Sequence, residues 1–323
     1  MRPHDRRTGA LAAALIACAL AAAAAPVAAA ETLRVGKAVN VAFSFVPLDI
    51  GVRKGFFEQN GITIEETTFG GDARMMQAMT ADGIDIALGS GPGMAFVAKG
   101  APLKGIAAMA GRPLLLTLVV RPDGPKTVAE LKGRTISVST AGSLTYWLVS
   151  ETARQQGWGP EGIAIAPMGA TQPQIAALKR KEIDGMVTDI STALALEQAG
   201  DMRILMRFGD LVKDFHIHVI FATNKDIAEK LEALRNFLKG WFETIKFMRA
   251  NKAETVDIAK EVIHKDADIT ARTYDTLMPM FSDDGKFDAK AMAVLAKSYV
   301  ELKVLPSEPD PKELVNEGFL PGR

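Results

Sequence analysis

The chain has 323 residues, of which 38 are lysine or arginine and 38 are aspartate or glutamate, so its formal net charge at pH 7 is zero. This balance excludes the strongly basic surface that binds nucleic acids or anionic membranes. The single cysteine, Cys18, and the four histidines exclude a disulfide framework, and they indicate neither a metal site nor another cofactor. The length is sufficient for two lobes.

Residues 1–30 have the pattern of an export signal. Arginines at positions 2, 6 and 7 precede an apolar, alanine-rich run, and small residues at 28–30 permit cleavage before Glu31. Residues 15–18 (LIAC) also resemble a lipobox, which would leave a lipidated Cys18, but the run stays apolar beyond this cysteine. We therefore expect a cleaved signal peptide and an exported protein, with a lipid anchor at Cys18 as the alternative.

Short apolar segments alternate with helical patterns as far as Phe221, which predicts strand-helix-strand units and parallel sheets. The expected strands are Leu33–Gly36, Ile62–Phe69, Ile84–Leu88, Leu103–Met109, Leu114–Val120, Thr135–Ser139, Ile163–Pro167, Gly185–Thr188, Met202–Phe208 and Ile217–Ala222. Beyond Asn224 the apolar spacing is helical throughout. The helices expected there are Lys225–Asn251, Ala253–His264, Ile269–Met280 and Asp288–Val304.

The stretch from Phe43 to Gly71 combines two loops with a helix and a strand. Pro47 suits the first turn of a helix, because its φ angle is already helical and its missing N–H would have no partner there. We expect this helix to run to Asn60 and Gly61. The strand that follows ends at Gly70-Gly71, and Asp72 is placed to cap the next helix.

An internal repeat relates the segments around residues 69–100 and 168–200 at an offset of 99 positions. Phe69-Gly-Gly-Asp72 aligns with Met168-Gly-Ala-Thr171, Ile84-Asp85 with Ile183-Asp184, and Ser90 with Asp189. Two copies of one strand-and-helix unit indicate two similar lobes. The loops after their strands would then face each other across a cleft.

Taken together, these segments resemble the nitrate, sulfonate, taurine and thiamine-precursor binding proteins of ABC importers. The resemblance covers nearly the whole mature chain and depends on the order and spacing of several short motifs. These are Pro47-Leu48, Gly55-Phe56-Phe57, Gly61-Ile62-Thr63-Ile64, Gly70-Gly71, Asp82-Gly83-Ile84-Asp85-Ile86-Ala87, Leu131-Lys132-Gly133-Arg134 and Ser282-Asp283-Asp284-Gly285.

The resemblance implies an α/β protein with the type II periplasmic-binding-protein fold, in which each of two lobes is a mostly parallel sheet flanked by helices. The chain would cross between the lobes twice at a hinge, near Val119–Asp123 and near His218–Ala222. The signal peptide would be residues 1–30, lobe one residues 31–119 and 222–323, and lobe two residues 120–221.

The loop Ser139–Thr145 is the strongest candidate for ligand contact. It precedes a helix, where free N–H groups and the positive dipole end suit an anion, and Gly142 lets a ligand approach the backbone. The hydroxyls of Ser139, Thr140, Ser143 and Thr145 add further donors. The alternative is that Ser143 simply caps the helix.

Other expected ligand-binding residues follow from the first loop and from the repeat. Phe43, Ser44 and Phe45 would present aromatic walls and one hydroxyl from lobe one, or else serve as core. The turns at Gly70, Gly71, Ser90, Gly91, Thr171 and Asp189 would line the two sides of the cleft. Asp189 could pair with an amine on the solute, or it could be only a helix cap.

The cationic and histidine side chains give weaker signals. Arg74 and Arg112 are the basic residues nearest to the expected cleft, and both are also consistent with an ordinary exposed surface position. His216 and His218 are two residues apart in a strand and share a face, but no third metal ligand lies near them in the sequence. We expect them to pack at the hinge.

The leading hypothesis is a periplasmic receptor, not an enzyme, that captures a small organic solute, anionic or aromatic, and delivers it to an ABC-importer permease. We expect it to act as a monomer. An enzyme of the thiamine-pyrimidine synthase type on the same fold is the alternative, although the mature chain lacks the cysteine and cleft histidines associated with that activity. The effector lobe of a gene regulator is excluded, because a signal sequence stands where DNA-binding helices would be needed.

Overall fold

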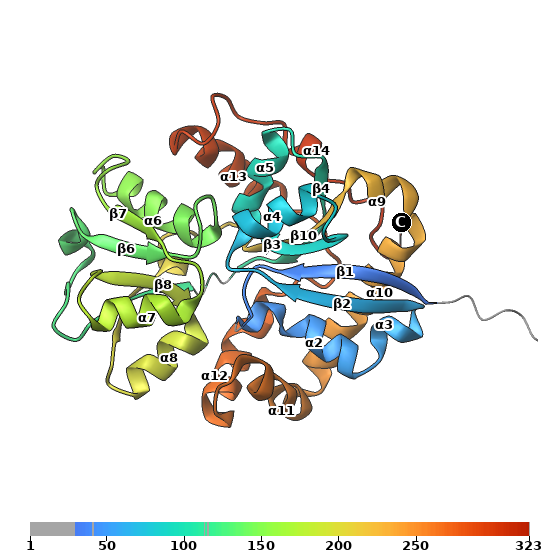
Figure 1. Ribbon diagram of the computed structural model, residues 1–323, viewed down its shortest axis with the longest axis horizontal. Helices are drawn as coiled ribbons and strands as arrows, with labels where there is room; N and C mark the ends of the chain where they lie inside the picture. The colour runs from blue at the N-terminus through green and yellow to red at the C-terminus, as the bar shows by residue number, and fades with distance from the viewer. Residues whose placement is uncertain (1–29, 41, 113, 115, 323) are drawn as a thin grey trace, which may run out of the picture.

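The computed structural model describes residues 30–40, 42–112, 114 and 116–322. The expected signal peptide, apart from Ala30, and Cys18 lie outside these residues. The described chain forms two halves side by side, each built on a five-stranded sheet with helices on its faces (Figure 1). No helix in this part of the chain has the length and apolar character needed to cross a membrane.

The first sheet has the strand order β2-β1-β3-β10-β4. Its strands are β1 (Glu31–Lys37), β2 (Ile62–Thr68), β3 (Ile86–Ser90), β4 (Leu103–Ala110) and β10 (His218–Thr223). β1 runs parallel to β2 and β3, whereas β10 runs antiparallel to β3 and β4.

The second sheet repeats this plan with the order β7-β6-β8-β5-β9. Its strands are β5 (Leu116–Val120), β6 (Thr135–Val138), β7 (Ala164–Pro167), β8 (Gly185–Asp189) and β9 (Arg203–Arg207). β6 is parallel to β7 and β8, and β5 is antiparallel to β8 and β9. All ten expected strands are present, with small shifts at their ends.

Both sheets are mostly parallel, as expected, and each contains one reversed strand: four of the five strands run in one direction, while β10 in the first sheet and β5 in the second run against them. β5 begins beside the end of β8, where Leu116 pairs with Asp189, and β10 begins beside the end of β3, where His218 pairs with Ser90. Each of these strands enters its sheet from the junction between the halves, where the parallel strands end. It therefore has to run in the opposite direction.

The chain passes from the first sheet to the second between Ala110 and Leu116, and it returns between the end of β9 at Arg207 and the start of β10 at His218. Both changes of sheet come a few residues before the expected crossings near Val119–Asp123 and His218–Ala222. β5 therefore lies wholly in the second sheet and β10 wholly in the first.

The repeat in the sequence corresponds to a repeat in structure. The Asp85 carboxylate accepts the backbone N–H of Arg34 at 2.7 Å, and the Asp184 carboxylate accepts that of Thr135 at 3.0 Å. In each half, this aspartate ties the segment before one parallel strand to the neighbouring strand. The two halves thus use the same side chain for the same purpose.

The helices cover both sheets, and those of the C-terminal part pack around the first half (Figure 1). They are α2 (Val46–Arg53), α3 (Phe56–Gln59), α4 (Asp72–Thr80), α5 (Met94–Ala98), α6 (Leu144–Gln155), α7 (Thr171–Lys179), α8 (Ile190–Gln198), α9 (Asn224–Glu229), α10 (Leu231–Ala250), α11 (Lys252–Ile263), α12 (Ala267–Leu277), α13 (Ala289–Glu301) and α14 (Pro311–Leu314). Short 3-10 turns are η1 (Phe43–Phe45), η2 (Gly91–Gly93), η3 (Val128–Leu131), η4 (Phe208–Asp210) and η5 (Met278–Met280).

Two expected helices are each divided in the structure. Pro47 lies in the first turn of α2 as predicted, but Gly55, with φ 72°, separates α2 from α3. A left-handed residue interrupts the helical backbone, and glycine adopts it without steric cost. The expected helix Lys225–Asn251 is divided at Lys230, whose φ is −120° and whose ammonium group pairs with Asp85 at 2.9 Å.

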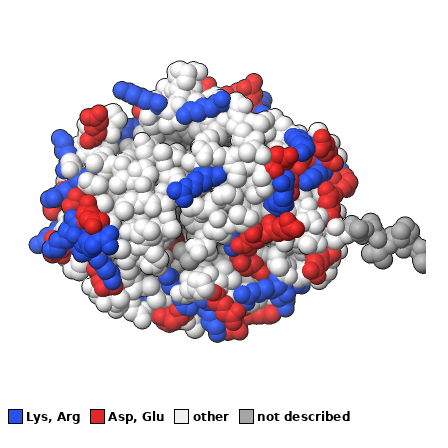
Figure 2. Space-filling model, in the orientation of Figure 1, with Lys and Arg blue, Asp and Glu red and all other residues white. Residues whose placement is uncertain are grey.

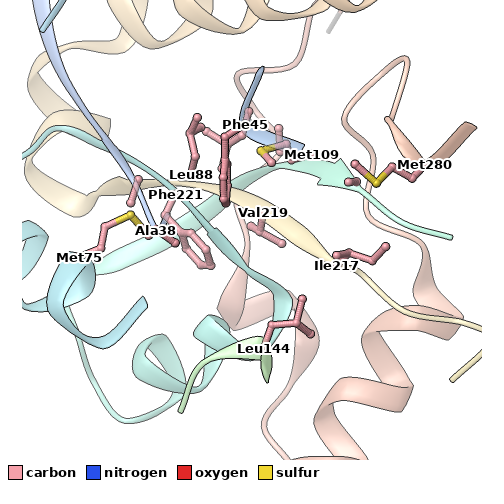
Figure 3. Packing of buried hydrophobic residues seen from close by; sticks show 14 of the residues in the cluster. Ala38, Phe45, Met75, Leu88, Met109, Leu144, Ile217, Val219, Phe221 and Met280 are labelled. Carbon is pink, nitrogen blue, oxygen red and sulfur yellow. The ribbon is translucent and has the colours of Figure 1, made fainter. Parts of the chain in front are cut away.

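The main hydrophobic core continues across the junction of the two halves. Figure 3 shows part of it, in which Leu144 from α6 lies near Val219 of β10 and Ile217, which precedes that strand. A smaller apolar cluster, which includes Leu178 and Met186, fills the second half alone. The loops at the junction are therefore supported by packed side chains on both sides.

Candidate functional site

A cavity of about 100 Å³ lies at the junction, where the parallel strands of both sheets end. Most of its lining is apolar and comes from both halves and from the chain segments that cross between them. The apolar part includes Ala38, Val39, Ala42, Leu114, Leu116, Leu144, Val187, Ile190, Ile217, Leu277 and Met280. Open α/β sheets bind ligands at this edge.

Most of the expected ligand-binding residues line this cavity. They are Phe43, Ser44, Phe45, Gly71, Ser90, Ser139, Thr145, Thr171 and Asp189. Five others do not line it, namely Gly70, Gly91, Thr140, Gly142 and Ser143. Asp72, Gln174, Thr188 and His218 add polar groups that were not expected there.

Gly71 and Thr140 form a contact between the two halves. The hydroxyl of buried Thr140 accepts the backbone N–H of Ala73 at 3.4 Å. Gly71 has φ 126°, and a Cβ atom placed on it would lie 2.6 Å from Thr140 Oγ1. Gly70 faces the other half as well, because a Cβ atom on it would lie 3.8 Å from Gly169 Cα. These residues bring the halves together beside the cavity.

The remaining residues outside the lining have structural roles. A Cβ atom on Gly91 would lie 1.9 Å from the carbonyl oxygen of His216, so only glycine fits beside this crossing segment. The side chain of Ser143 accepts the N–H of Tyr146 at 3.3 Å, which confirms helix capping for this residue. Gly142 has φ 73° in the preceding turn and faces a different cavity.

The hydroxyls of Ser139 and Thr145 form an ordered network at the start of α6. Thr145 Oγ1 accepts the N–H of Ser139 at 3.0 Å, and it lies 3.1 Å from Ser139 Oγ and 2.9 Å from Ser143 Oγ. These bonds fix the orientation of the hydroxyl dipoles that line the cavity. Preorganised dipoles bind a ligand with little loss of side-chain entropy.

Asp189 caps α8 and also lines the cavity. Its Oδ1 accepts the N–H of Thr192 at 3.0 Å and the hydroxyl of Ser191. Its Oδ2 has a longer contact, 3.4 Å to the hydroxyl of Thr188. An ionised carboxylate has about four lone-pair positions, so Oδ2 can accept a further donor from a ligand.

Asp72 contributes a second carboxyl group, and it does not cap α4 as expected. Gly71 precedes the first turn of this helix, and Asp72 Oδ1 instead accepts the N–H of Ser90 at 2.9 Å. The carboxyl group is only 4% exposed, and burial raises its pKa, although hydrogen bonds from Ser90 and from the backbone of Leu144 act in the opposite direction. Leu144 begins α6, so Asp72 lies between the two halves.

His218 also lines the cavity, whereas hinge packing was the expectation for both histidines. His216 does pack in this way, since its Nε2 accepts the N–H of Asp288 at 2.9 Å. His218 stands edge-on to Phe45 with ring centroids 4.9 Å apart, and among the described residues its buried Nδ1 has no hydrogen-bond partner. Burial lowers the pKa of His218 to about 3, so the ring is neutral.

The ionisable groups in the described lining of the cavity are the carboxyl groups of Asp72 and Asp189 and the imidazole of His218. Within the described ranges, neither lysine nor arginine lines it. Arg74 is exposed beside Gly70 and outside the lining, while Arg112 is 76% exposed and pairs with Asp214 at 3.2 Å. On the face drawn in Figure 2, charged side chains gather towards the edges and few lie over the junction. The described residues contain no group of three or more metal-ligating side chains either.

Two similar mixed sheets, two chain crossings and a cavity at their junction define the periplasmic-binding-protein fold. The chain belongs to the NMT1/THI5-like family, whose model matches residues 42–255. This confirms the resemblance and the fold class predicted from the sequence.

Individual proteins agree with this assignment. A Haemophilus influenzae protein named "Putative thiamine biosynthesis protein" is 29% identical over 94 residues, and the match covers 29% of this chain and 30% of that relative. The match thus spans less than a third of the relative's length.

Among solved structures, a protein of Bordetella bronchiseptica RB50 superposes with a TM-score of 0.79 and 20% identity, over 90% of this chain and 95% of the other. The periplasmic aliphatic sulphonate binding protein of Escherichia coli gives a TM-score of 0.70 and 19% identity, over 88% and 92%. At this identity, the likeness concerns the fold.

Proposed function

We propose that the protein is a solute receptor that closes its two halves around a small organic molecule. The observation that carries this proposal is the cavity itself, which is lined by both halves and by the segments that join them. Lobe one would contain the first sheet and the C-terminal helices, and lobe two the second sheet. Hinge motion at the two crossings would open and close the cavity.

We propose that the receptor works in the periplasm after removal of residues 1–30 and presents its solute to an ABC-importer permease. It acts as a monomer and does no chemistry on the solute. The receptor is favoured over the enzyme alternative because the described lining of the cavity contains no cysteine and only one histidine, His218. The ligand contacts would come from the expected residues that line the cavity.

The solute has an aromatic or otherwise apolar body and carries nitrogen-bearing donor groups, either neutral or protonated. The apolar lining and the rings of Phe43 and Phe45 support the first feature. The carboxyl groups of Asp72 and Asp189 support the second. Moving an anion from water into this cavity, whose described lining offers neither lysine nor arginine to pair with it, would cost several kcal/mol. The sequence left two solute classes open, anionic and aromatic. Because the described lining has carboxyl groups and neither lysine nor arginine, it argues against the anionic class and leaves the aromatic one.

Thermal unfolding in the presence of matched solutes tests this proposal. Each set would contain an aromatic amidine or amine, the neutral amide and the corresponding carboxylate and sulfonate, beginning with benzamidine, benzamide, benzoate and benzenesulfonate. Ligands that bind only the folded state raise the melting temperature. We expect shifts for the nitrogen-bearing members alone. Larger shifts with the anions would contradict the solute class, and no shift with any of a broad panel would contradict the receptor.

A further inference from the structure

A second cavity, of about 270 Å³, lies between α5 of the first half, the start of α6 of the second half and the end of α13. We propose that it is a second ligand site, separate from the junction cavity, and that it takes a small anion with an aromatic body. The argument depends on the ring walls of the cavity, on its charges and on its position between the two halves.

The walls are aromatic rings whose orientation is fixed. Tyr299 is 1% exposed, and its hydroxyl donates to the carbonyl of Gly91 at 3.1 Å. Trp147 is 3% exposed, and its indole N–H donates to Ser298 Oγ at 2.9 Å. These bonds fix the two buried rings as the base of the cavity, and the partly buried rings of Phe96 and Tyr146 present more accessible aromatic surface beside them. An occupant with an aromatic body can pack on them.

The charges of the second cavity are the reverse of those of the first. Lys99 and Lys303 line it, both exposed, and neither has an ion pair or a side-chain hydrogen bond within the part of the chain that the structure describes. No aspartate or glutamate belongs to the described lining. Tyr146 also lines the cavity, and its hydroxyl has no bonded partner among the described residues. Two ammonium groups without counterions fit a sulfonate or carboxylate.

The cavity has walls on both halves. Phe96 of α5 comes from the first half, and its ring would lie 3.7 Å from a Cβ atom placed on Gly142 of the second. An occupant would therefore touch both halves at once, as the solute proposed for the junction cavity would. The second site does not depend on the identity of that solute.

Fluorescence titration with 8-anilinonaphthalene-1-sulfonate tests the proposal, since this probe joins aromatic rings to a sulfonate. We expect binding by the wild-type protein and an affinity about tenfold lower in the double variant Lys99→Gln/Lys303→Gln. The matched control is Lys126→Gln/Lys132→Gln, which removes two exposed lysines that do not line the cavity. This control should bind the probe as the wild type does.

Two further measurements locate the probe. The variant Ala42→Trp fills the junction cavity, so it should leave probe binding unchanged if the probe occupies the second cavity. The uncharged analogue N-phenyl-1-naphthylamine should bind the wild type and the double variant equally. Absence of probe binding, equal losses in the double variant and its control, or loss of binding in Ala42→Trp would each overturn the proposal.

Discussion

Ser90 and Asp189 occupy equivalent positions in the two halves and perform the same local task. The hydroxyl of Ser90 accepts the N–H of Gly93 at 3.2 Å, and the carboxylate of Asp189 accepts that of Thr192 at 3.0 Å. Both side chains also line the junction cavity. The capping role needs no charge, because serine performs it in the first half. We infer that the carboxylate of Asp189 serves the solute.

Asp189→Asn separates these two roles. Asparagine is a good helix cap, so the free energy of unfolding should change by less than about 0.5 kcal/mol. A hydrogen bond to a charged group contributes about 1.5–3 kcal/mol, so affinity for a protonated solute should fall at least about tenfold. Calorimetric titration and thermal unfolding measure the two quantities.

The control for Asp189→Asn is Asp266→Asn, which makes the same change at the cap of α12, where the carboxylate accepts the N–H of Ile269 at 2.8 Å. Asp266 does not line the cavity. Its variant should bind the solute as the wild type does. Equal solute affinities in the Asp189→Asn and Asp266→Asn proteins would show that Asp189 does not contribute to binding.

Gly71→Ala should prevent the close approach of the two halves. Its Cβ atom would lie 2.6 Å from the side chain of Thr140, and φ 126° is a conformation that essentially only glycine adopts. We expect about tenfold weaker solute binding and a larger radius of gyration in solution scattering.

Gly133→Ala provides the comparison for Gly71→Ala. This glycine also has a positive φ, 74°, but a Cβ atom on it would meet nothing within 4 Å. The substitution should lower stability through backbone strain and leave affinity unchanged. A Gly71→Ala protein that binds solute normally would show that the halves do not need this contact.

Asp72→Asn should change how stability depends on pH. Burial raises the pKa of Asp72 above its ordinary value of 3.8, so the folded protein holds this proton at pH values where the unfolded chain has released it. Wild-type stability therefore falls as the pH rises from 3.8 through the raised pKa. The difference in unfolding free energy, variant minus wild type, should be larger at pH 8 than at pH 4. A constant difference over this range would contradict the assignment.

Asp85 should show the opposite dependence on pH. The side chain is 1% exposed, and although burial raises its pKa, hydrogen bonds from Arg34 and Lys230 lower it to about 2. The carboxylate then contributes stability above pH 3.8, and this contribution disappears as the pH falls from 3.8 to about 2. Asp85→Asn should cost about 2 kcal/mol at pH 7 and almost nothing near pH 2.

Denaturant unfolding of Asp85→Asn and of its repeat equivalent, Asp184→Asn, checks this difference. Asp184 is 24% exposed, and within the described residues its one ionic partner is Arg134, at 3.5 Å. At pH 7, Asp184→Asn should therefore lower the free energy of unfolding by less than Asp85→Asn does. A larger loss for Asp184→Asn would mean that burial and pairing of Asp85 do not govern stability.

The strands and the repeat could be predicted because their signals are local. Apolar runs such as Leu103–Met109 identify strands, and the offset between Asp85 and Asp184 identifies the second copy. The direction of β5 and β10 could not be predicted in this way. It depends on where each strand enters its sheet, which is set by the packing of the two halves and not by the residues of the strand.

The polar lining of the cavity was predicted only in part, again for physical reasons. Ser90 and Asp189 follow strands, so their position at the sheet edge was readable from the sequence. Asp72 stands at a helix start, where capping was the simplest expectation, and only the fold brings it to the N–H of Ser90. His218 opens β10, and its role depends on that strand lying between β3 and β4 at the junction.

Native mass spectrometry of the protein purified without denaturation tests the central claim most directly. We expect the wild type to carry one small solute per chain. Ala42→Trp, in which a large side chain occupies the junction cavity, should carry none and should melt at a temperature similar to that of the wild type stripped of its solute. Identifying the released solute would then establish its charge. A wild-type protein with no bound solute and no stabilising ligand, or a solute that Ala42→Trp retains, would contradict the account.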